Sequence, residues 1–393
     1  MKRLSLISAA VTMAVAGLLI PSTAQGARNM EVAIQDDPVL LSQSYYSRER
    51  ALQHAQALGA TYIRVNMIWD AVVVSPESTR TPRPIVYDWR QYDTLIDAAA
   101  RYGMRIQLTL TGPAPAFATY NRRRGVWGPK PAAYGAFARA AARHFKGRVD
   151  RYAIWNEPNY ISWMSPHGRS PALYRQIYKA AYKEIKRVSR RNLVLIGETA
   201  PYKIRRRAIA PLQFIRDVAC AKGRGARLSK DLCTGLRADG FAHHPYDYRH
   251  SPTYKYRGSD NATLGTLSRL TNTLRGLRRS RALRTPRGGQ LPVYLTEYGY
   301  FQSGKYALGA RRAGYLRRAF AMANRNRHVK QMVQFGLIEA PLNFPGAYFD
   351  LSLIRNNGTP TPAFESLRVW AASARIKRPS GPITLPPAPA ARR

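Results

Sequence analysis

Residues 152–163 read YAIWNEPNYISW, and this stretch raises the question that organises the rest of the chain. An apolar and aromatic run, residues 152–155, leads directly into Asn156, Glu157 and Pro158. Such a run, bounded by a proline, is typical of a buried β-strand. A carboxylate is costly to bury unless another group pairs with it. The stretch therefore predicts a strand that ends in a glutamate, with partners supplied from elsewhere in the sequence.

Similar strand-like runs recur along the chain. They are MEVAIQ (30–35), TYIRVNMIW (61–69), MRIQLTLTG (104–112), VDRYAIWNE (149–157), NLVLIGET (192–199), ADGFAHHPY (238–246), PVYLTEYGY (292–300) and VKQMVQFGL (329–337). Helix-like stretches with apolar residues on one face separate them, for example at 47–60, 91–103, 171–188 and 311–326. Alternation of strand and helix eight times predicts an α/β protein with the (β/α)8 TIM-barrel fold. A doubly wound open sheet also alternates, but it often carries a Gly-rich phosphate loop after its first strand, and this sequence has none.

The two ends of the chain differ from the part between them. Lys2 and Arg3 precede an apolar stretch and then small residues, so residues 1–26 are predicted to be a secretory signal peptide. An uncleaved membrane anchor is the alternative. Residues 27–375 form the predicted barrel, and residues 376–393 are a Pro-rich basic tail that is predicted to be disordered. We therefore expect a secreted, extracellular protein with no membrane span after signal cleavage.

The formal net charge of +41 favours contact with a polyanion. The arginines are nevertheless scattered, in segments such as RRRG, IKRVSRRN, KIRRR and LRRSRALR, and they need not form one stripe. We interpret them mainly as a solvated basic surface and expect no specific nucleic-acid partner. Association with an acidic cell wall or acidic polysaccharide is a secondary possibility. The two cysteines, Cys220 and Cys233, predict a disulfide in an oxidising compartment, with two free thiols as the alternative.

A barrel places its active-site groups at the C-terminal ends of its strands. Among the residues at or near these ends are Arg64, Trp69, Asn156, Glu157, Glu198, His243, His244, Tyr246, Glu297 and Glu339. Two carboxylates across a barrel mouth suit cleavage of a glycosidic bond, with one as general acid and the other as nucleophile or base. Glu157 and Glu297 are the candidates, because both have aromatic and polar neighbours. The alternative for either glutamate is a structural salt bridge, which Arg64 could supply.

WNEPN at 155–159 and TEYG at 296–299 resemble the clan A glycoside hydrolases, most closely family 39 or family 5 cellulase-like proteins. The resemblance covers roughly residues 30–372, and GTPTPAFESLRVW (358–370) is similar to the segment that closes such domains. It implies a retaining (β/α)8 enzyme with Glu157 as acid/base and Glu297 as nucleophile. Asn156 would bind the sugar 2-hydroxyl, and Arg64 would hold the nucleophile ionised.

The same resemblance extends to the sixth strand, where His244 and Tyr246 form a His-x-Tyr pattern. The tyrosine would orient the nucleophile and the histidine would touch the substrate or the acid, although His243 could replace His244. Apart from the resemblance, the strand-end or loop positions of Trp69, Trp127 and Trp163 suit stacking on sugar rings, and Trp69 is expected to bind substrate; packing is the alternative for each. The chain departs from many clan members at the eighth strand, where Phe335 or nothing replaces a tryptophan platform. Glu198 and Glu339 are expected to have no catalytic role.

These patterns predict a secreted retaining glycoside hydrolase that acts on O-glycosidic bonds of a poly- or oligosaccharide. No cofactor or metal is expected, because two carboxylates suffice for the reaction. The alternative is a non-catalytic carbohydrate- or cell-wall-binding protein on the same scaffold. A polyanion binder driven by charge is a third reading, and the salt dependence of binding would distinguish it.

Overall fold

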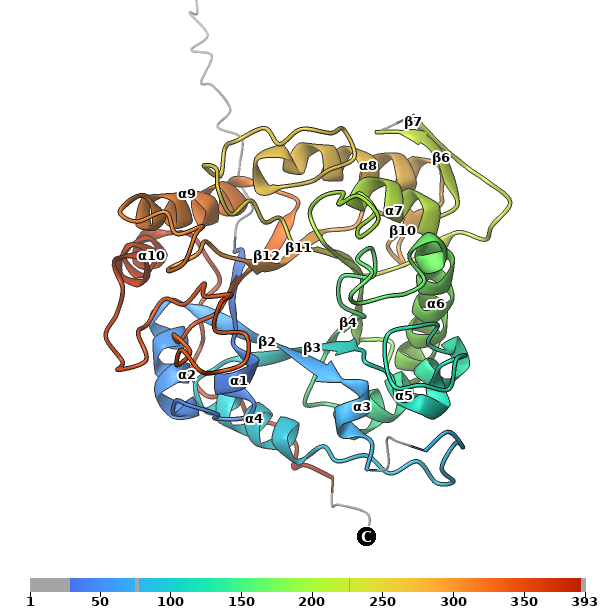
Figure 1. Cartoon of the computed structure of the whole chain (residues 1–393), viewed down its shortest axis with the longest axis horizontal. Helices are drawn as coiled ribbons and strands as arrows, with labels where there is room; N and C mark the ends of the chain where they lie inside the picture. Colours follow the sequence, from blue (N-terminus) through green and yellow to red (C-terminus); the bar gives the residue numbers. More distant parts are fainter. Residues whose placement is uncertain (1–28, 75–77, 226, 390–393) are drawn as a thin grey trace, which may run out of the picture.

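The computed structural model describes residues 29–74, 78–225 and 227–389. Eight parallel strands close into a barrel, and helices surround it (Figure 1). In barrel order the strands are β1 (Glu31–Gln35), β12 (Val329–Phe335), β11 (Val293–Tyr298), β9 (Gly240–His243), β5 (Leu193–Thr199), β4 (Arg151–Ile154), β3 (Arg105–Thr111) and β2 (Ala60–Ile68). The predicted (β/α)8 barrel and all eight predicted strands are confirmed.

The helices are α1 (Asp37–Leu40), α2 (Arg48–Ala57), α3 (Trp69–Val72), α4 (Arg90–Arg101), α5 (Pro131–His144), α6 (Ser170–Val188), α7 (Pro211–Val218), α8 (Leu267–Arg279), α9 (Arg311–Arg325) and α10 (Pro362–Ser373). Local sequence explains their limits. Ser47 caps α2 by accepting a hydrogen bond from the Arg50 backbone N–H. Gly103, at a φ of 72° that favours glycine, follows the end of α4. The four helical stretches named from the sequence correspond to α2, α4, α6 and α9.

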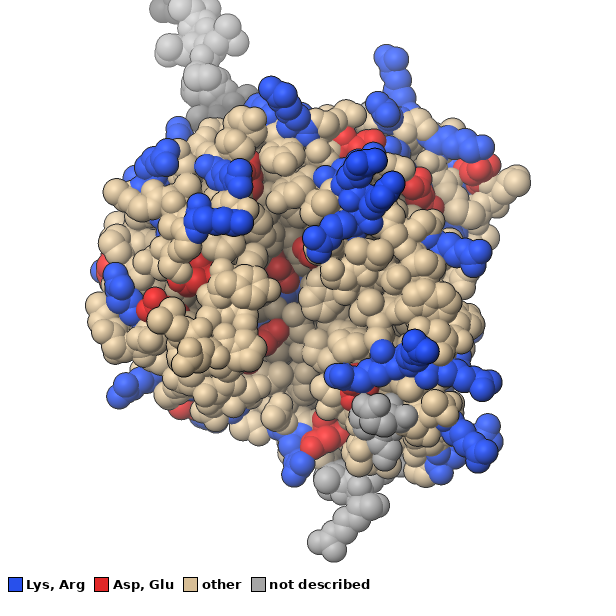
Figure 2. Space-filling model, viewed as in Figure 1, with Lys and Arg blue, Asp and Glu red and all other residues tan. Residues whose placement is uncertain are grey.

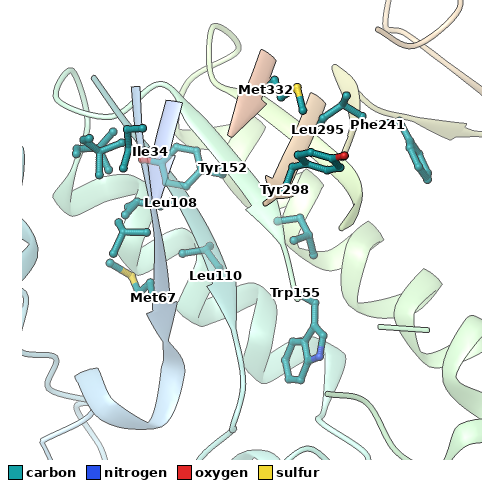
Figure 3. Close-up of a cluster of buried hydrophobic side chains, with 14 of the residues drawn as sticks. Ile34, Met67, Leu108, Leu110, Tyr152, Trp155, Phe241, Leu295, Tyr298 and Met332 are labelled. Atoms are coloured by element: carbon teal, nitrogen blue, oxygen red, sulfur yellow. The ribbon is translucent and has the colours of Figure 1, made fainter. Parts of the chain in front are cut away.

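Successive residues of β3 show which side chains of a strand face the helices and which face the barrel interior. Leu108 and Leu110 belong to the main hydrophobic cluster, in which side chains from several strands meet (Figure 3). Gln107 and Thr109, one residue before each, are buried polar residues of the opposite strand face. Because successive side chains of a strand point to opposite faces, the apolar set packs the helices while the polar set faces the barrel interior.

The barrel interior is occupied by a charged pair near the start of the strands. Arg151 of β4 donates to Glu31 of β1 at 2.8 Å, and its guanidinium lies 3.9 Å from the ring centre of Tyr62 and 4.9 Å from that of Tyr294. The charge of this buried arginine is therefore compensated within the barrel. This layer closes one end of the barrel and leaves the other end for the site.

Between α7 and β9, the hairpin of β6 (Ala221–Arg224) and β7 (Arg227–Lys230) lies outside the barrel (Figure 1). The predicted disulfide is confirmed: Cys220 and Cys233 are bonded, and they flank this hairpin. A short parallel pair, β8 (Leu236–Arg237) and β10 (Leu283–Arg284), joins two segments that are far apart in sequence.

The predicted signal peptide, residues 1–26, lies outside the described residues. No helix in the described ranges has the length and apolar character needed to cross a bilayer. The tail differs from the expected disorder over residues 376–389. Lys377 N–H donates to the Met30 carbonyl at 2.9 Å, and Ile383 N–H donates to the Ala100 carbonyl at 2.8 Å. Ile376 and Leu385 pack against the core, so apolar side chains among the prolines anchor this segment.

Candidate active site

Charged and polar side chains from the ends of five of the eight strands meet at the mouth of the barrel. This group, here called the site cluster, consists of Arg64, Asn156, Glu157, Glu198, His244, Tyr246 and Glu297. Figure 2 shows a hollow at the centre of this face with acidic atoms at its bottom. Lys and Arg side chains are spread over the same face and do not form a single stripe (Figure 2). Six of the seven site residues predicted from the sequence, all except Trp69, belong to the site cluster.

Arg64 of β2 is the centre of the cluster and is fully buried. Its Nη1 donates to Glu297 Oε1 at 2.8 Å, and its Nη2 donates to Glu198 Oε2 at 2.8 Å and to Asn156 Oδ1 at 3.0 Å. Burial alone would lower the pKa of Arg64, but the two carboxylates outweigh it and raise the pKa above its usual range. Arg64 therefore donates a hydrogen bond to the candidate nucleophile, Glu297. It also forms the structural salt bridge that the sequence left open as its alternative role.

Glu297, on β11, has a donor on each carboxylate oxygen. Arg64 donates to Oε1, and the Tyr246 hydroxyl donates to Oε2 at 3.1 Å. The register of β11 shifts between Leu295 and Tyr298, and both Thr296 and Glu297 contact members of the cluster. Hydrogen bonds to both oxygens stabilise the charged form of a carboxylate. This arrangement suits a nucleophile.

Glu157 stands on the loop that follows β4. Both Trp155 and Glu157 have positive φ, 65° and 37°, and the Glu157 backbone N–H donates to the Glu198 carbonyl at 2.8 Å. The side chain retains 16% of its surface exposed toward the mouth. Burial raises the pKa of Glu157, against the lowering effect of the hydrogen bond from His244. A carboxyl group whose pKa is raised and that reaches the mouth suits a general acid.

The rest of the WNEPN stretch fixes this loop. The Trp155 indole N–H donates to the Trp163 carbonyl at 2.6 Å, and the ring is fully buried. Gly112 makes room for that ring, because a Cβ there would lie 2.7 Å from it. Asn159 accepts from the Ala200 N–H at 2.8 Å and donates to the Ile209 carbonyl at 2.8 Å, which joins the loop to the segment after β5. The unusual strand end is thus held by its aromatic and amide residues.

His244 lies between the carboxylates. Its Nε2 is 2.7 Å from Glu198 Oε2, and its Nδ1 is 3.0 Å from Glu157 Oε1 and 3.5 Å from Glu297 Oε2. Burial alone would lower the pKa of His244, but the carboxylates of Glu297, Glu157 and Glu198 outweigh it and raise the pKa to about 10. These carboxylates therefore favour the charged form of the ring.

The shared imidazole limits the distance between the two candidate catalytic carboxylates. Because the Glu157 and Glu297 oxygens lie 3.0 and 3.5 Å from the same Nδ1, they are at most about 6.5 Å apart. Retaining glycosidases separate their carboxyl groups by about 5–5.5 Å and inverting ones by about 6.5–9.5 Å. This bound applies to one oxygen of each carboxylate, and it includes the retaining separation.

Sequence reasoning gave no role to Glu198, yet this residue is in the cluster and fully buried. The register of β5 shifts between Gly197 and Thr199, and Glu198 itself has a φ of 49°. Gly197 has a φ of 117°, and a Cβ there would lie 2.4 Å from the Ala242 carbonyl oxygen. A glycine inside a strand often marks a bulge, so Gly197 directly before Glu198 was the available signal.

Trp69 is a correction to the sequence prediction. It is fully buried, and its ring stacks on Phe137 with centres 5.2 Å apart, so it has no exposed face to offer a sugar.

His243 is also buried, with its ring nitrogens on Thr199 and on the Ala262 carbonyl, and burial lowers its pKa to about 4. His244 is therefore the histidine of the cluster. Glu339 lies apart and accepts from the Asn356 N–H at 3.3 Å.

A cavity of about 1130 Å³ opens beside the cluster. Its aromatic walls include Tyr202, Tyr248, Tyr256, Phe301, Tyr306 and Phe349. Tyr248 stacks on Tyr246 with ring centres 4.8 Å apart, which links the cavity to the residue that donates to Glu297. Phe335 packs on the edge of Phe349 behind this wall.

Among the described residues, no group of three or more His, Cys, Asp and Glu side chains is arranged to hold a metal ion.

No family model and no curated protein matches the sequence. Several solved structures match its fold. A family 39 glycoside hydrolase from Bacteroides cellulosilyticus WH2 is 17% identical, with a TM-score of 0.63 over 88% of this chain and 64% of that chain. A monomeric β-xylosidase from Caulobacter crescentus CB15 is 17% identical, with a TM-score of 0.55 over 88% of this chain and 69% of that chain.

The GH5_18 protein from Bifidobacterium longum is 13% identical, with a TM-score of 0.57 over 89% of this chain and 81% of that chain. The chain covers 64% of the Bacteroides protein, which is under two thirds of the length of that protein. At these identities the likeness shows a shared fold. The structural neighbours include families 39 and 5, the two that the sequence resembles.

Proposed function

We propose that this protein is a retaining glycoside hydrolase that cleaves O-glycosidic bonds of an oligo- or polysaccharide. The observation that carries the proposal is the pair Glu157 and Glu297, held on either side of one imidazole nitrogen. One member has two donors that favour the carboxylate, and the pKa of the other is raised by burial. These are the two environments that a nucleophile and a general acid require.

In the first step, a Glu297 oxygen attacks the anomeric carbon while the glycosidic C–O bond breaks. The leaving oxygen takes the proton of Glu157, and the sugar is left as an ester of Glu297. Asn156 accepts from Arg64 through Oδ1, which leaves its amide nitrogen to donate to the sugar 2-hydroxyl in this proposal. A hydrogen bond there strengthens as the oxocarbenium ion develops.

In the second step, the anionic Glu157 removes a proton from water, and the oxygen of that water attacks the anomeric carbon. The bond to Glu297 breaks, and the enzyme returns to its starting protonation state. Two inversions at one carbon give net retention. Every proton and bond in this cycle is accounted for by the two glutamates, the substrate and water.

The aromatic cavity next to the cluster supports a carbohydrate substrate of more than one sugar residue. Two structural neighbours are a β-xylosidase and an exo-β-1,4-mannosidase, so β-xylosides and β-mannosides are the first sugars to test. We further propose that the protein is exported. The Cys220–Cys233 disulfide is compatible with an oxidising compartment, and the basic surface would favour an acidic wall or polysaccharide.

The test is a panel of aryl β-glycosides (xyloside, glucoside, mannoside, galactoside, arabinoside and glucuronide), followed by polysaccharides. Wild type would be compared with Glu157→Ala, Glu297→Ala and the matched control Glu339→Gln, whose carboxylate lies outside the cluster. We expect one glycoside to be cleaved with retention by proton NMR, both alanine variants to lose activity, and azide to restore a product. An inert wild type that still binds a polysaccharide would instead indicate the non-catalytic binding protein.

A further inference from the structure

Glu198 is a third buried carboxylate in the site, and the two-glutamate cycle does not use it. One of its oxygens, Oε2, accepts from Arg64 at 2.8 Å and from the Thr296 hydroxyl at 3.0 Å, and lies 2.7 Å from His244 Nε2. The side chain has no exposed surface. It cannot reach a sugar from there, so any effect on the reaction must pass through its neighbours.

We propose that Glu198 is a positioning residue that keeps His244 protonated on both ring nitrogens, so that its Nδ1–H serves the two catalytic carboxylates in turn. The catalytic meaning of this inference rests on the proposed glycosidase function. An ionised carboxylate at 2.7 Å can only accept, so Nε2 must carry a proton. The second proton then faces Glu157 and Glu297.

The charges of the cluster support this assignment. The titratable groups around the ring are Glu157 after β4, Glu198 on β5, Glu297 on β11, Arg64 on β2, and His243 and Tyr246 from its own segment. With Glu157 protonated and a neutral imidazole, the cluster would hold two carboxylates against Arg64 alone. A positive His244 balances this buried group, and an unbalanced buried charge is costly.

The reaction moves negative charge past this ring. When the glycosidic bond breaks, Glu297 loses its charge by forming the ester and Glu157 becomes anionic by giving up its proton. The His244 Nδ1 lies 3.5 Å from the oxygen that starts charged and 3.0 Å from the oxygen that ends charged. A fixed cation at this point stabilises both states without moving.

The directions of the pKa shifts agree with the geometry. The carboxylates around His244 outweigh its burial and raise its pKa to about 10. For Glu198, burial raises the pKa, but Arg64 and His244 outweigh it and hold the pKa below its usual value. Each partner thus favours the charged form of the other.

The test begins with the full chain labelled with ¹⁵N-histidine, titrated by NMR from pH 5 to 11. Glu198→Gln removes the charge and keeps the shape, and His244→Asn assigns the signal among the seven histidines. Glu31→Gln is the matched control, because it breaks the other buried Arg–Glu pair of the barrel, at 2.8 Å from Arg151. We expect the His244 midpoint to fall by about 1–3 pH units in Glu198→Gln and to stay unchanged in Glu31→Gln.

An unchanged midpoint in folded Glu198→Gln would overturn the proposal. So would a wild-type His244 with one ring proton at pH 7, which needs no variant to fold. Neither readout needs a substrate, so an inert wild type defeats the proposed function without deciding the role of Glu198.

A kinetic comparison separates positioning from simple structural support. An aryl glycoside with a poor leaving group needs the proton of Glu157, whereas a dinitrophenyl glycoside does not. We expect Glu198→Gln to lose at least about tenfold more kcat/KM on the poor leaving group, and Glu198→Asp to recover part of it. Equal losses on both substrates would contradict the proposal.

Discussion

Arg64→Met removes the charge at the centre of the site cluster while keeping much of the side-chain volume. Two buried carboxylates, Glu198 and Glu297, each lose a partner at 2.8 Å. Breaking one buried ion pair by removing one partner costs about 3–5 kcal/mol. We therefore expect the free energy of unfolding, measured with urea at pH 7, to fall by at least about 3 kcal/mol.

The pH dependence gives this prediction its sign. The folded-state pKa of Glu198 lies below its ordinary value of 4.5. Its ion pair therefore contributes stability above that value and loses it as the pH falls through the folded-state pKa. Without Arg64, burial dominates and Glu198 takes up a proton more easily. The difference between wild type and Arg64→Met should therefore shrink as the pH falls from 7 toward 4.

A double-mutant cycle with Glu198→Gln measures the coupling directly. Replacing both partners leaves a neutral pair, so the double variant should be less destabilised than the sum of the single ones by at least about 1 kcal/mol. If Arg64→Met costs less than about 1 kcal/mol, as an exposed pair would, or if the two substitutions are additive, the reasoning about this buried network is wrong.

Four further outcomes follow from the same contacts. Tyr246→Phe removes one donor from Glu297, and since a hydrogen bond to a charged group contributes about 1.5–3 kcal/mol, kcat/KM should fall about 10- to 100-fold. Burial raises the pKa of Glu157, which must be protonated to act as acid, so activity should persist above the usual carboxyl range and decline as the pH rises further; Glu157→Ala with a dinitrophenyl glycoside should lose that decline. Trp69→Phe should lower stability in a urea titration and leave KM unchanged, because Trp69 packs on Phe137 away from the mouth. Native protein should show no reactive thiol in a thiol-titration assay, and Cys220→Ser with Cys233→Ser should cost at most about 3 kcal/mol of stability and no activity, since the loop that they close is short and lies outside the barrel.

Much of the site could be predicted from the sequence because its residues stand where strands end. In a barrel, all such ends meet at one mouth, so Arg64, Asn156, Glu157, Tyr246 and Glu297 could be brought together without coordinates. The WNEPN stretch helped further, because its polar residues interrupt an otherwise apolar run.

Trp69 shows where this reasoning fails. Its position just after a strand placed it near the mouth, but the one-turn helix α3 begins at this residue. Which way a side chain points at such a junction depends on a single change of backbone direction. Here the ring packs against Phe137 of α5, a contact between segments far apart in sequence. No local sequence pattern shows whether the ring of such a tryptophan packs on a core residue or stacks on a sugar.

Sequence alone determined the number and order of the strands, the barrel and the two candidate glutamates, because hydrophobic periodicity and strand-end residues are local properties. The folded structure was needed to place Glu198 in the site and to show that His244, not His243, lies between the carboxylates. Both decisions depend on bulges and on contacts across the barrel. The charge of a buried group is set by neighbours from other strands, and those neighbours become known only when the barrel closes.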